Sequence, residues 1–340
     1  MKICLTVIAV SAFFGGVFGL TQSEFQIVGL WRGALAGALI SAPIATFELF
    51  YARGVAGRSL RQAPLWQFLL VRTGVYTLAT LIGELLSRLP FIGTTAASGI
   101  GLDSALLFSF AFTMVVATVF NFLLVVNQLL GKNVLLNLFT GRYHRPRQEA
   151  RIFLFADMVG STGIAEQIGN ERFLQLLNSC FFDITEPVLR HGGEIYRYVG
   201  DEVIVTWKTG DRVANSRAFA CGMAIDALFK ARSVEYEREF GVAPAFRIAL
   251  HSGQVVAGEI GDFKREITYL GDVVNTTARI VQACRETGQP ILASAGLVGL
   301  TKAVAGMNLK PLGDFKLRGK SEMVELYSVG VGAQAEIRAG

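Results

Sequence analysis

The sequence predicts a helical membrane region followed by an α+β domain. Within the first 130 of the 340 residues, four long apolar segments each have about the length needed to cross a bilayer. From residue 151 onward, apolar runs of strand length alternate with segments whose apolar residues recur at helical spacing. We therefore expect an all-α membrane domain at 1–130, a linker at 131–150, an α+β domain at 151–330 and a C-terminal tail at 331–340.

The four apolar segments cover about residues 3–22, 28–50, 66–88 and 104–130. The middle two carry charges toward their ends, where long side chains can reach the polar interface. We interpret these charges as interfacial. They are Arg32, Glu48, Arg72 and Glu84.

Basic residues predict the orientation of the chain. Arg53, Arg58 and Arg61 lie between the second and third segments, and further basic residues follow the fourth. The positive-inside rule then places both termini and the α+β domain in the cytoplasm, at a cell membrane that the chain crosses several times. Residues 1–20 could instead be a cleaved signal peptide, because a short basic start precedes an apolar run. The α+β domain would remain cytoplasmic in either case.

Composition argues against several partners. The net charge is +5, but most of the positive excess lies in the apolar part, so a nucleic-acid partner is not expected. The first histidine is His144, so no histidine pair can hold a haem within the membrane domain. The four cysteines are scattered, which favours reduced structural thiols. Leucines and a valine at 129–138 give a short helical stripe, which either packs on its own domain or forms the seam of a parallel dimer.

The α+β domain begins with a regular alternation of elements. Expected in chain order are a strand at 151–157, a helix at 162–190, a hairpin at 194–207, a helix at 211–239 and a strand at 245–252. This is the ferredoxin-like order, with helices packed on one face of a mostly antiparallel sheet. A third helix at about 272–286 and short strands near 290–293 and 311–329 complete the domain.

Two acidic residues are placed to meet at one edge of this sheet. Asp157 ends the first strand, and Asp201 lies in the Gly200-Asp201 turn of the hairpin. Two carboxylates with little else to neutralise them suit hard divalent cations such as Mg²⁺. Two metals bridged by two acids are what an in-line displacement at phosphorus needs. Either aspartate alone is more often only a turn or cap residue.

Four motifs follow one another between residues 148 and 330. They are Phe155-Ala-Asp-Met-Val-Gly-Ser-Thr162, Tyr198-Val-Gly-Asp201, Tyr269-Leu-Gly-Asp-Val-Val-Asn-Thr-Thr-Ala-Arg279 and Leu317-Arg-Gly319. Together they resemble the class III nucleotidyl cyclases. The resemblance implies a ferredoxin-like catalytic domain that converts ATP to 3′,5′-cyclic AMP and pyrophosphate, with two Mg²⁺ or Mn²⁺ ions per site. It also implies a homodimer, in which one subunit supplies the metal acids and the other supplies the groups that bind the base, the ribose and the transition state.

The resemblance gives Asp157 and Asp201 the role of metal ligands. It implies that Asn275 orients the ribose and that Arg279 neutralises charge on the α-phosphorus in the transition state. These two residues are four apart, so on a helix they share one face. In isolation, Asn275 would be interpreted as a cap and Arg279 as part of a solvated face.

Phosphate contacts are implied at two further places. The backbone around Met158, Val159 and Gly160 would hold phosphate oxygens, which suits amides at a helix N-terminus. Arg318 stands where the family usually has Lys for the terminal phosphates, and Arg is a natural substitute there.

Two positions set the choice of base in this family, and here they are Arg197 and Thr268. Arg197 replaces the Lys of most adenylyl cyclases, and its donors suit adenine N1, whereas a guanine site would want an acceptor such as Glu. ATP is therefore expected ahead of GTP, although the guanidinium is bulkier than an ammonium group. The alternatives are a guanylyl cyclase, or a catalytically inactive cyclase-like dimerisation or receptor module. The retention of Asp157, Asp201 and Arg279 argues against the inactive module.

Overall fold

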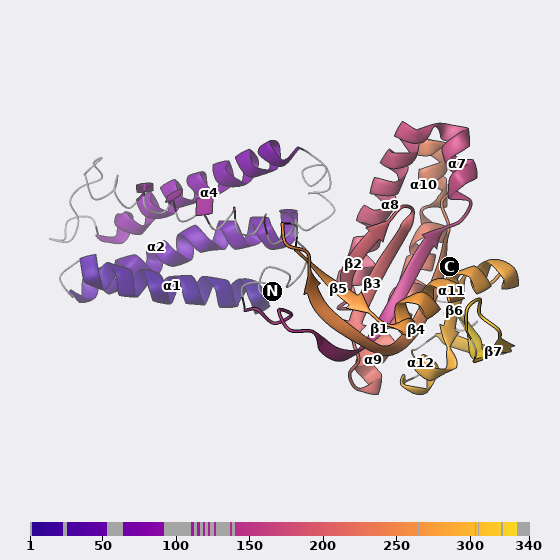
Figure 1. Cartoon of the computed structure of the whole chain (residues 1–340). Coiled ribbons are helices and arrows are strands. Elements are labelled where there is room, and N and C mark those ends of the chain that lie inside the picture. The colour runs from indigo at the N-terminus through magenta and orange to yellow at the C-terminus, as the bar shows by residue number, and fades with distance from the viewer. Residues whose placement is uncertain are drawn as a thin grey trace. The chain divides into compact units, whose positions relative to one another are not determined.

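The computed structural model describes residues 2–22, 26–52 and 64–91, scattered positions between 110 and 137, and residues 140–331 except 264, 303, 305 and 321. It divides into two compact units, Met1–Leu129 and Leu130–Gly340 (Figure 1). The first unit is helical, and the second combines a sheet with helices. Each unit is described by itself.

Among the described residues of the first unit, three helices are long and apolar enough to cross a membrane. They are α1 (Lys2–Gln22), α2 (Ile27–Thr46) and α4 (Leu65–Arg88). A π-helical segment, η1 (Phe47–Ala52), continues α2, and a 3-10 turn, η3 (Leu89–Phe91), follows α4. These helices coincide with the first three predicted segments. The fourth, 104–130, and the leucine stripe at 129–138 lie largely outside the described residues.

Glycines allow α1 and α2 to pack backbone against backbone. A Cβ atom on Gly33 would lie 2.1 Å from the carbonyl oxygen of Gly15, and one on Gly19 would lie 2.0 Å from that of Gly29. No side chain fits at such distances. Small residues at a spacing of four promote close helix packing in membranes, where van der Waals contact replaces the hydrophobic effect. This close packing was not predicted from the sequence.

The variant Gly33→Ala is expected to force α1 and α2 apart and to lower the thermal unfolding midpoint of the protein in detergent. Overpacking of a close contact typically costs about 1–3 kcal/mol. Gly74→Ala on α4 is the matched control, because a Cβ atom there meets nothing within 4 Å. Equal midpoints for the two variants would contradict the close packing.

Two of the charges expected at the membrane interface instead pair with each other. Arg72 is 4% exposed and donates from Nε to Oε1 of Glu48 at 2.7 Å, with a second hydrogen bond from Nη2 to Oε2. The Tyr76 hydroxyl donates to the same Oε1 at 2.7 Å. A charge in an apolar medium is costly unless it is paired, so this ion pair ties η1 to α4.

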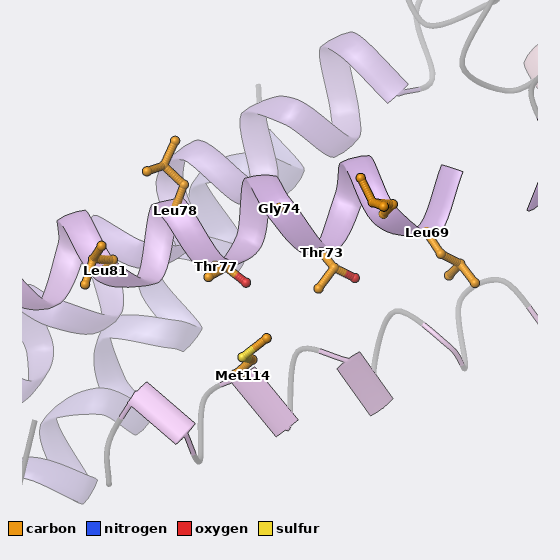
Figure 2. A pocket seen from close by; sticks show the side chains of 8 residues that line it. Leu69, Thr73, Gly74, Thr77, Leu78, Leu81 and Met114 are labelled. Carbon is orange, nitrogen blue, oxygen red and sulfur yellow. The ribbon is translucent and has the colours of Figure 1, made fainter. Parts of the chain in front are cut away.

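An open groove of about 730 Å³ runs along α4 between Leu69 and Leu81, with Met114 opposite (Figure 2). Its lining is aliphatic except for Thr73 and Thr77. The groove is therefore complementary to hydrocarbon rather than to a charged nucleotide.

Within the described part of the second unit, eight strands form one mixed sheet in the order β2-β3-β1-β4-β6-β8-β7, with β5 paired to β4. The strands are β1 (Arg147–Met158), β2 (Glu194–Val199), β3 (Glu202–Lys208), β4 (Phe246–Ile260), β5 (Glu266–Leu270), β6 (Ile291–Ser294), β7 (Met307–Phe315) and β8 (Val324–Val331). Strand β1 is antiparallel to both β3 and β4. The first four strands thus have the ferredoxin-like arrangement, which confirms the predicted fold class.

Helices cover both faces of the sheet, not one face as predicted. On one face, Ile152 and Leu154 of β1 pack with α8 (Asn170–Arg190), α9 (Arg212–Ala231) and α10 (Ser233–Phe240). On the other, Phe153 and Phe155 pack with α11 (Asp272–Thr287). Strand β1 is apolar on both faces, which is the pattern of a strand covered on both sides.

The helices of the first face are also divided more finely than predicted. Gly169, with φ of 84°, separates the short α7 (Ser161–Ile168) from α8. This backbone conformation favours glycine and ends a right-handed helix. Arg232 likewise lies between α9 and α10, and a short α12 (Ala295–Gly299) follows β6.

Candidate active site

The two aspartates lie at adjacent strand ends, as the sequence predicts. Asp157 is paired with Glu202 of β3 on one side and with Arg247 of β4 on the other. Asp201 follows Gly200 in the turn that joins β2 to β3, and Gly200 has φ of 61°. The carbonyl oxygen of Asp201 accepts the amide of the residue after Asp157 at 3.3 Å, which ties the turn to the end of β1.

The carboxylates of Asp157, Asp201 and Glu202 repel one another at this edge of the sheet. Burial and the nearby charge of Asp201 raise the pKa of Asp157, while Arg247 opposes the shift. Burial, Asp157 and Asp201 together raise the pKa of Glu202 to about 7. Carboxylates that disfavour one another's charge gain from a cation placed between them. Little was predicted to neutralise the acids, but Arg247 Nη1 lies 3.8 Å from Oδ2 of Asp157 and neutralises that carboxylate in part.

The donor set fits a Mg²⁺-type ion completed by substrate and water. Among the residues that the structure describes, no three His, Cys, Asp or Glu side chains are grouped to hold a metal by themselves. Mg²⁺ is usually bound by one or two carboxylates, with phosphate oxygens and waters as the other ligands. Asp157 and Asp201 suit that mode of binding.

In the turn after β1, two of the backbone amides expected to bind phosphate donate to carbonyl oxygens of the protein. The amide of Met158 donates to Asp201 O, and that of Val159 donates to the carbonyl oxygen of Ala245 at 2.8 Å. Both amides are therefore engaged by the protein itself. Gly160, with φ of 69°, precedes the first turn of α7. The amides at the start of that helix are the ones suitably placed for a phosphate.

Asn275 and Arg279 share the outer face of α11, as predicted. The residues that α11 buries are Val273, Thr276, Thr277, Ile280, Val281, Ala283 and Cys284. Asn275 is exposed, and Arg279 is half-buried with Nη1 donating to Oε1 of Gln282 at 3.4 Å. Both side chains are thus free of the sheet that carries the aspartates.

Helix α11 runs antiparallel to β4. Near its start, Val273 lies against Gly253, where an added Cβ atom would meet Val273 at 3.1 Å. Near its end, the Cys284 thiol donates to the carbonyl oxygen of Ile248 at 3.6 Å.

This direction separates Asn275 from Asp157 within one chain. Gly253 is paired with Arg151 of β1, six residues before Asp157 in the strand. At about 3.3 Å per residue, the first turn of α11 therefore lies about 20 Å along β1 from Asp157. Asp157 and Asn275 therefore lie at separate places on the domain.

The two positions that the sequence analysis assigned to base choice are brought together. Arg197 of β2 donates from Nη2 to Oε2 of Glu266 at 2.7 Å, and Glu266 begins β5. Thr268 of β5 is buried, and its hydroxyl lies 3.1 Å from the hydroxyl of Tyr196. Glu266 and Tyr196 were not predicted from the sequence, because their partners depend on side-chain contacts between β2 and β5, which are distant in the chain.

The loop that carries Arg318 is tied to the start of α11. Arg318 is exposed, Leu317 is buried beside it, and Lys320 pairs with Asp272. This hydrogen bond lowers the pKa of the Asp272 carboxyl. Lys320 was not identified from the sequence, and its contact fixes Arg318 near the helix that bears Asn275.

Residues 143–329 match the family model for the adenylate and guanylate cyclase catalytic domain. The chain belongs to this family. It is 39% identical over 212 residues to adenylate cyclase 2 of Rhizobium meliloti (strain 1021), which covers 62% of this chain and 58% of that protein. It is 31% identical over 190 residues to adenylate cyclase 1 of the same organism, covering 54% of this chain and 28% of that protein. The chain thus spans less than two thirds of the length of these relatives.

Solved structures give the same fold. The adenylyl cyclase CyaB from P. aeruginosa superposes with a TM-score of 0.51 at 22% identity, over 56% of this chain and 98% of that chain. A bacterial light-regulated adenylyl cyclase superposes with a TM-score of 0.56 at 21% identity, over 66% of each chain. In this cyclase domain, the acidic edge at Asp157 and the outer face of α11 lie at different places on one chain.

Proposed function

We propose that this chain is a membrane-bound adenylyl cyclase that converts ATP to 3′,5′-cyclic AMP and pyrophosphate at sites shared between two copies. The observation that carries the proposal is the pair Asp157 and Asp201 at one sheet edge of a cyclase catalytic domain. The names of the two Rhizobium meliloti relatives support ATP as the substrate.

Each residue has a distinct task in this proposal. Asp157 and Asp201 hold two divalent ions, Mg²⁺ or Mn²⁺, which when bound acidify the ribose 3′-hydroxyl and neutralise the phosphates. Asn275 hydrogen-bonds the ribose, and Arg279 donates to the α-phosphate oxygens as their charge grows. Arg318 and the amides at the start of α7 bind the other phosphates.

The distance between the two halves of the site supports a dimer. Because Asp157 and Asn275 lie about 20 Å apart along β1, a complete site needs the acids of one chain and α11 of another. A two-fold symmetric dimer forms two such sites, because each chain supplies its acids to one site and its α11 to the other.

Base choice is predicted to favour ATP over GTP, with Arg197 and Thr268 as donors. The charge reversal Arg197→Glu is expected to lower ATP turnover about tenfold or more before any use of GTP appears, because a charged hydrogen bond is lost and Glu266 is left facing another acid. Arg190→Glu on α8 is the matched control, since Arg190 is exposed and pairs only locally with Glu186. Steady-state rates with both nucleotides give the answer, and a wild type that prefers GTP would contradict the proposal.

A guanylyl cyclase is the second candidate. It is favoured by one observation, the Glu266 carboxylate at 2.7 Å from Arg197, because guanine recognition needs an acceptor for its N1–H and 2-amino group. The same comparison of ATP and GTP decides between the two candidates.

For the membrane domain we propose four spans, with the cyclase domain in the cytoplasm. The three apolar helices and the basic residues of the sequence support this arrangement. Reporter fusions after Arg61 and after Arg147 are expected to be cytoplasmic, and an insertion near Ala97 is expected to lie outside. A cytoplasmic signal at Ala97 would contradict the four-span topology.

A further inference from the structure

Strand β2 has a bulge at Tyr196, the residue before Arg197. Ile195 is paired with Val205 of β3 and Arg197 is paired with the adjacent Ile204, so Tyr196 is the extra residue of the ladder. Successive side chains of a regular strand point to opposite faces, whereas a bulge re-aims a side chain and bends its strand.

The bulge directs two successive side chains toward β5. Tyr196 packs in the hydrophobic cluster on the α11 face of the sheet, and Ile204, the partner of Arg197, belongs to the same cluster. The Arg197 guanidinium carbon lies 5.2 Å from the centre of the Tyr196 ring. Arg197 then reaches Glu266, and Tyr196 reaches Thr268.

The Tyr196 hydroxyl has two partners on β5. It accepts the backbone amide of Tyr269 at 3.3 Å, and it lies 3.1 Å from Oγ1 of Thr268. With its oxygen accepting from the amide, its proton is available for Thr268. The proton of the Thr268 hydroxyl is then left for another acceptor.

Tyr269, whose amide donates to the Tyr196 hydroxyl, is fixed by contacts with two aromatic rings and a guanidinium group. Its ring lies 4.9 Å from that of Tyr196 and 5.9 Å from that of Phe153, and the guanidinium of Arg151 stacks 4.4 Å above it. Arg151 is 1% exposed and donates to Glu149 at 3.0 Å and to Glu194 at 3.3 Å. An anchor whose neighbours are fixed by packing and charge can orient the group that it contacts.

We propose that Tyr196 is a positioning residue for base recognition, which holds the Thr268 hydroxyl in one orientation as a hydrogen-bond donor toward the purine. This inference rests on the proposed role of Thr268 in binding ATP. Tyr196 acts through Thr268 and does not touch the reacting atoms. A purely structural tyrosine would contribute only its ring, which phenylalanine would replace.

The variant Tyr196→Phe of the intact chain, in detergent or lipid, separates the hydroxyl from the ring. We expect its KM for ATP to rise about fivefold, which is the effect on binding of losing one hydrogen bond. Its kcat is expected to stay within about twofold of wild type, and its thermal unfolding midpoint is expected not to change. Thr268→Val is expected to raise KM similarly. Because both variants remove one interaction, the double variant is expected to have the KM of Thr268→Val alone.

Tyr327→Phe is the control, because it removes a hydroxyl of β8 that donates to Glu325 at 3.1 Å in an exposed hydrogen bond, and its KM is expected to stay at the wild-type value. An unchanged KM in Tyr196→Phe, or effects of the two substitutions that multiply in the double variant, would overturn the inference while leaving the proposed function intact. A folded wild type that forms no cyclic AMP from ATP would overturn the proposed function and, with it, this inference.

Discussion

Asp157→Asn is expected to lower the rate of cyclic AMP formation by about a thousandfold or more while leaving the protein folded. The amide has the shape of the carboxylate but lacks the charge that holds a divalent ion, and metal catalysis supplies several kcal/mol of transition-state stabilisation. Asp201→Ala should have a similar effect, because both carboxylates lie at the same sheet edge.

Stability provides an independent readout for Asp157→Asn. Burial and the charge of Asp201 raise the pKa of Asp157, so its ionisation opposes folding at neutral pH in the absence of metal. The variant is therefore expected to unfold at the wild-type temperature or above it, although it is inactive. Asp226→Asn on α9, where the carboxylate pairs only with Lys230, is the matched control and should keep full activity. Normal turnover in Asp157→Asn would contradict the assignment of the metal site.

Mixing two inactive variants is expected to restore activity. Asp157→Ala and Arg279→Ala should each be nearly inactive, because every site of either homodimer carries one lesion. A mixed dimer has one site with both lesions and one with neither, since Asp157 and α11 of one chain serve different substrates. Random assortment makes about half of the dimers mixed, so recovery should approach roughly a quarter of wild-type activity.

The control for this experiment is a mixture of Asp157→Ala with Asp201→Ala. Both acids belong to the same half-site of one chain, so that mixed dimer has one lesion in each site and should stay inactive. Absence of recovery with Arg279→Ala, in a preparation in which mixed dimers are demonstrated, would mean that Asp157 and Arg279 serve one site within one chain.

The strand ends of the acidic edge could be predicted because two local signals agree there. An apolar run that stops at Asp157 and a Gly200-Asp201 turn each fix an element boundary, and the pairing of β1 with β3 brings them together. Asn275 and Arg279 were placed on one helix face for the same reason, since helical spacing alone decides it.

The features that the sequence did not predict depend on partners distant in the chain. The bulge at Tyr196 arises from the register of β2 against β3, and the contact between Arg197 and Glu266 arises from the position of β5. The hydrogen bond from the Val159 amide to the carbonyl oxygen of Ala245 likewise depends on a residue that is distant in the sequence. In the first unit, the sequence predicted Glu48 and Arg72 separately at the membrane–water interface, whereas the structure shows that they form an ion pair.

Product analysis of the intact wild-type chain tests the central claim most directly. The purified protein, in detergent or lipid, is incubated with ATP and either Mg²⁺ or Mn²⁺, and both products are measured. We expect cyclic AMP and pyrophosphate in equal amounts, and neither product when the divalent ion is removed by a chelator. A folded, dimeric preparation that forms no cyclic AMP from ATP, or that forms cyclic GMP from GTP at the higher rate, would contradict the assignment as an adenylyl cyclase.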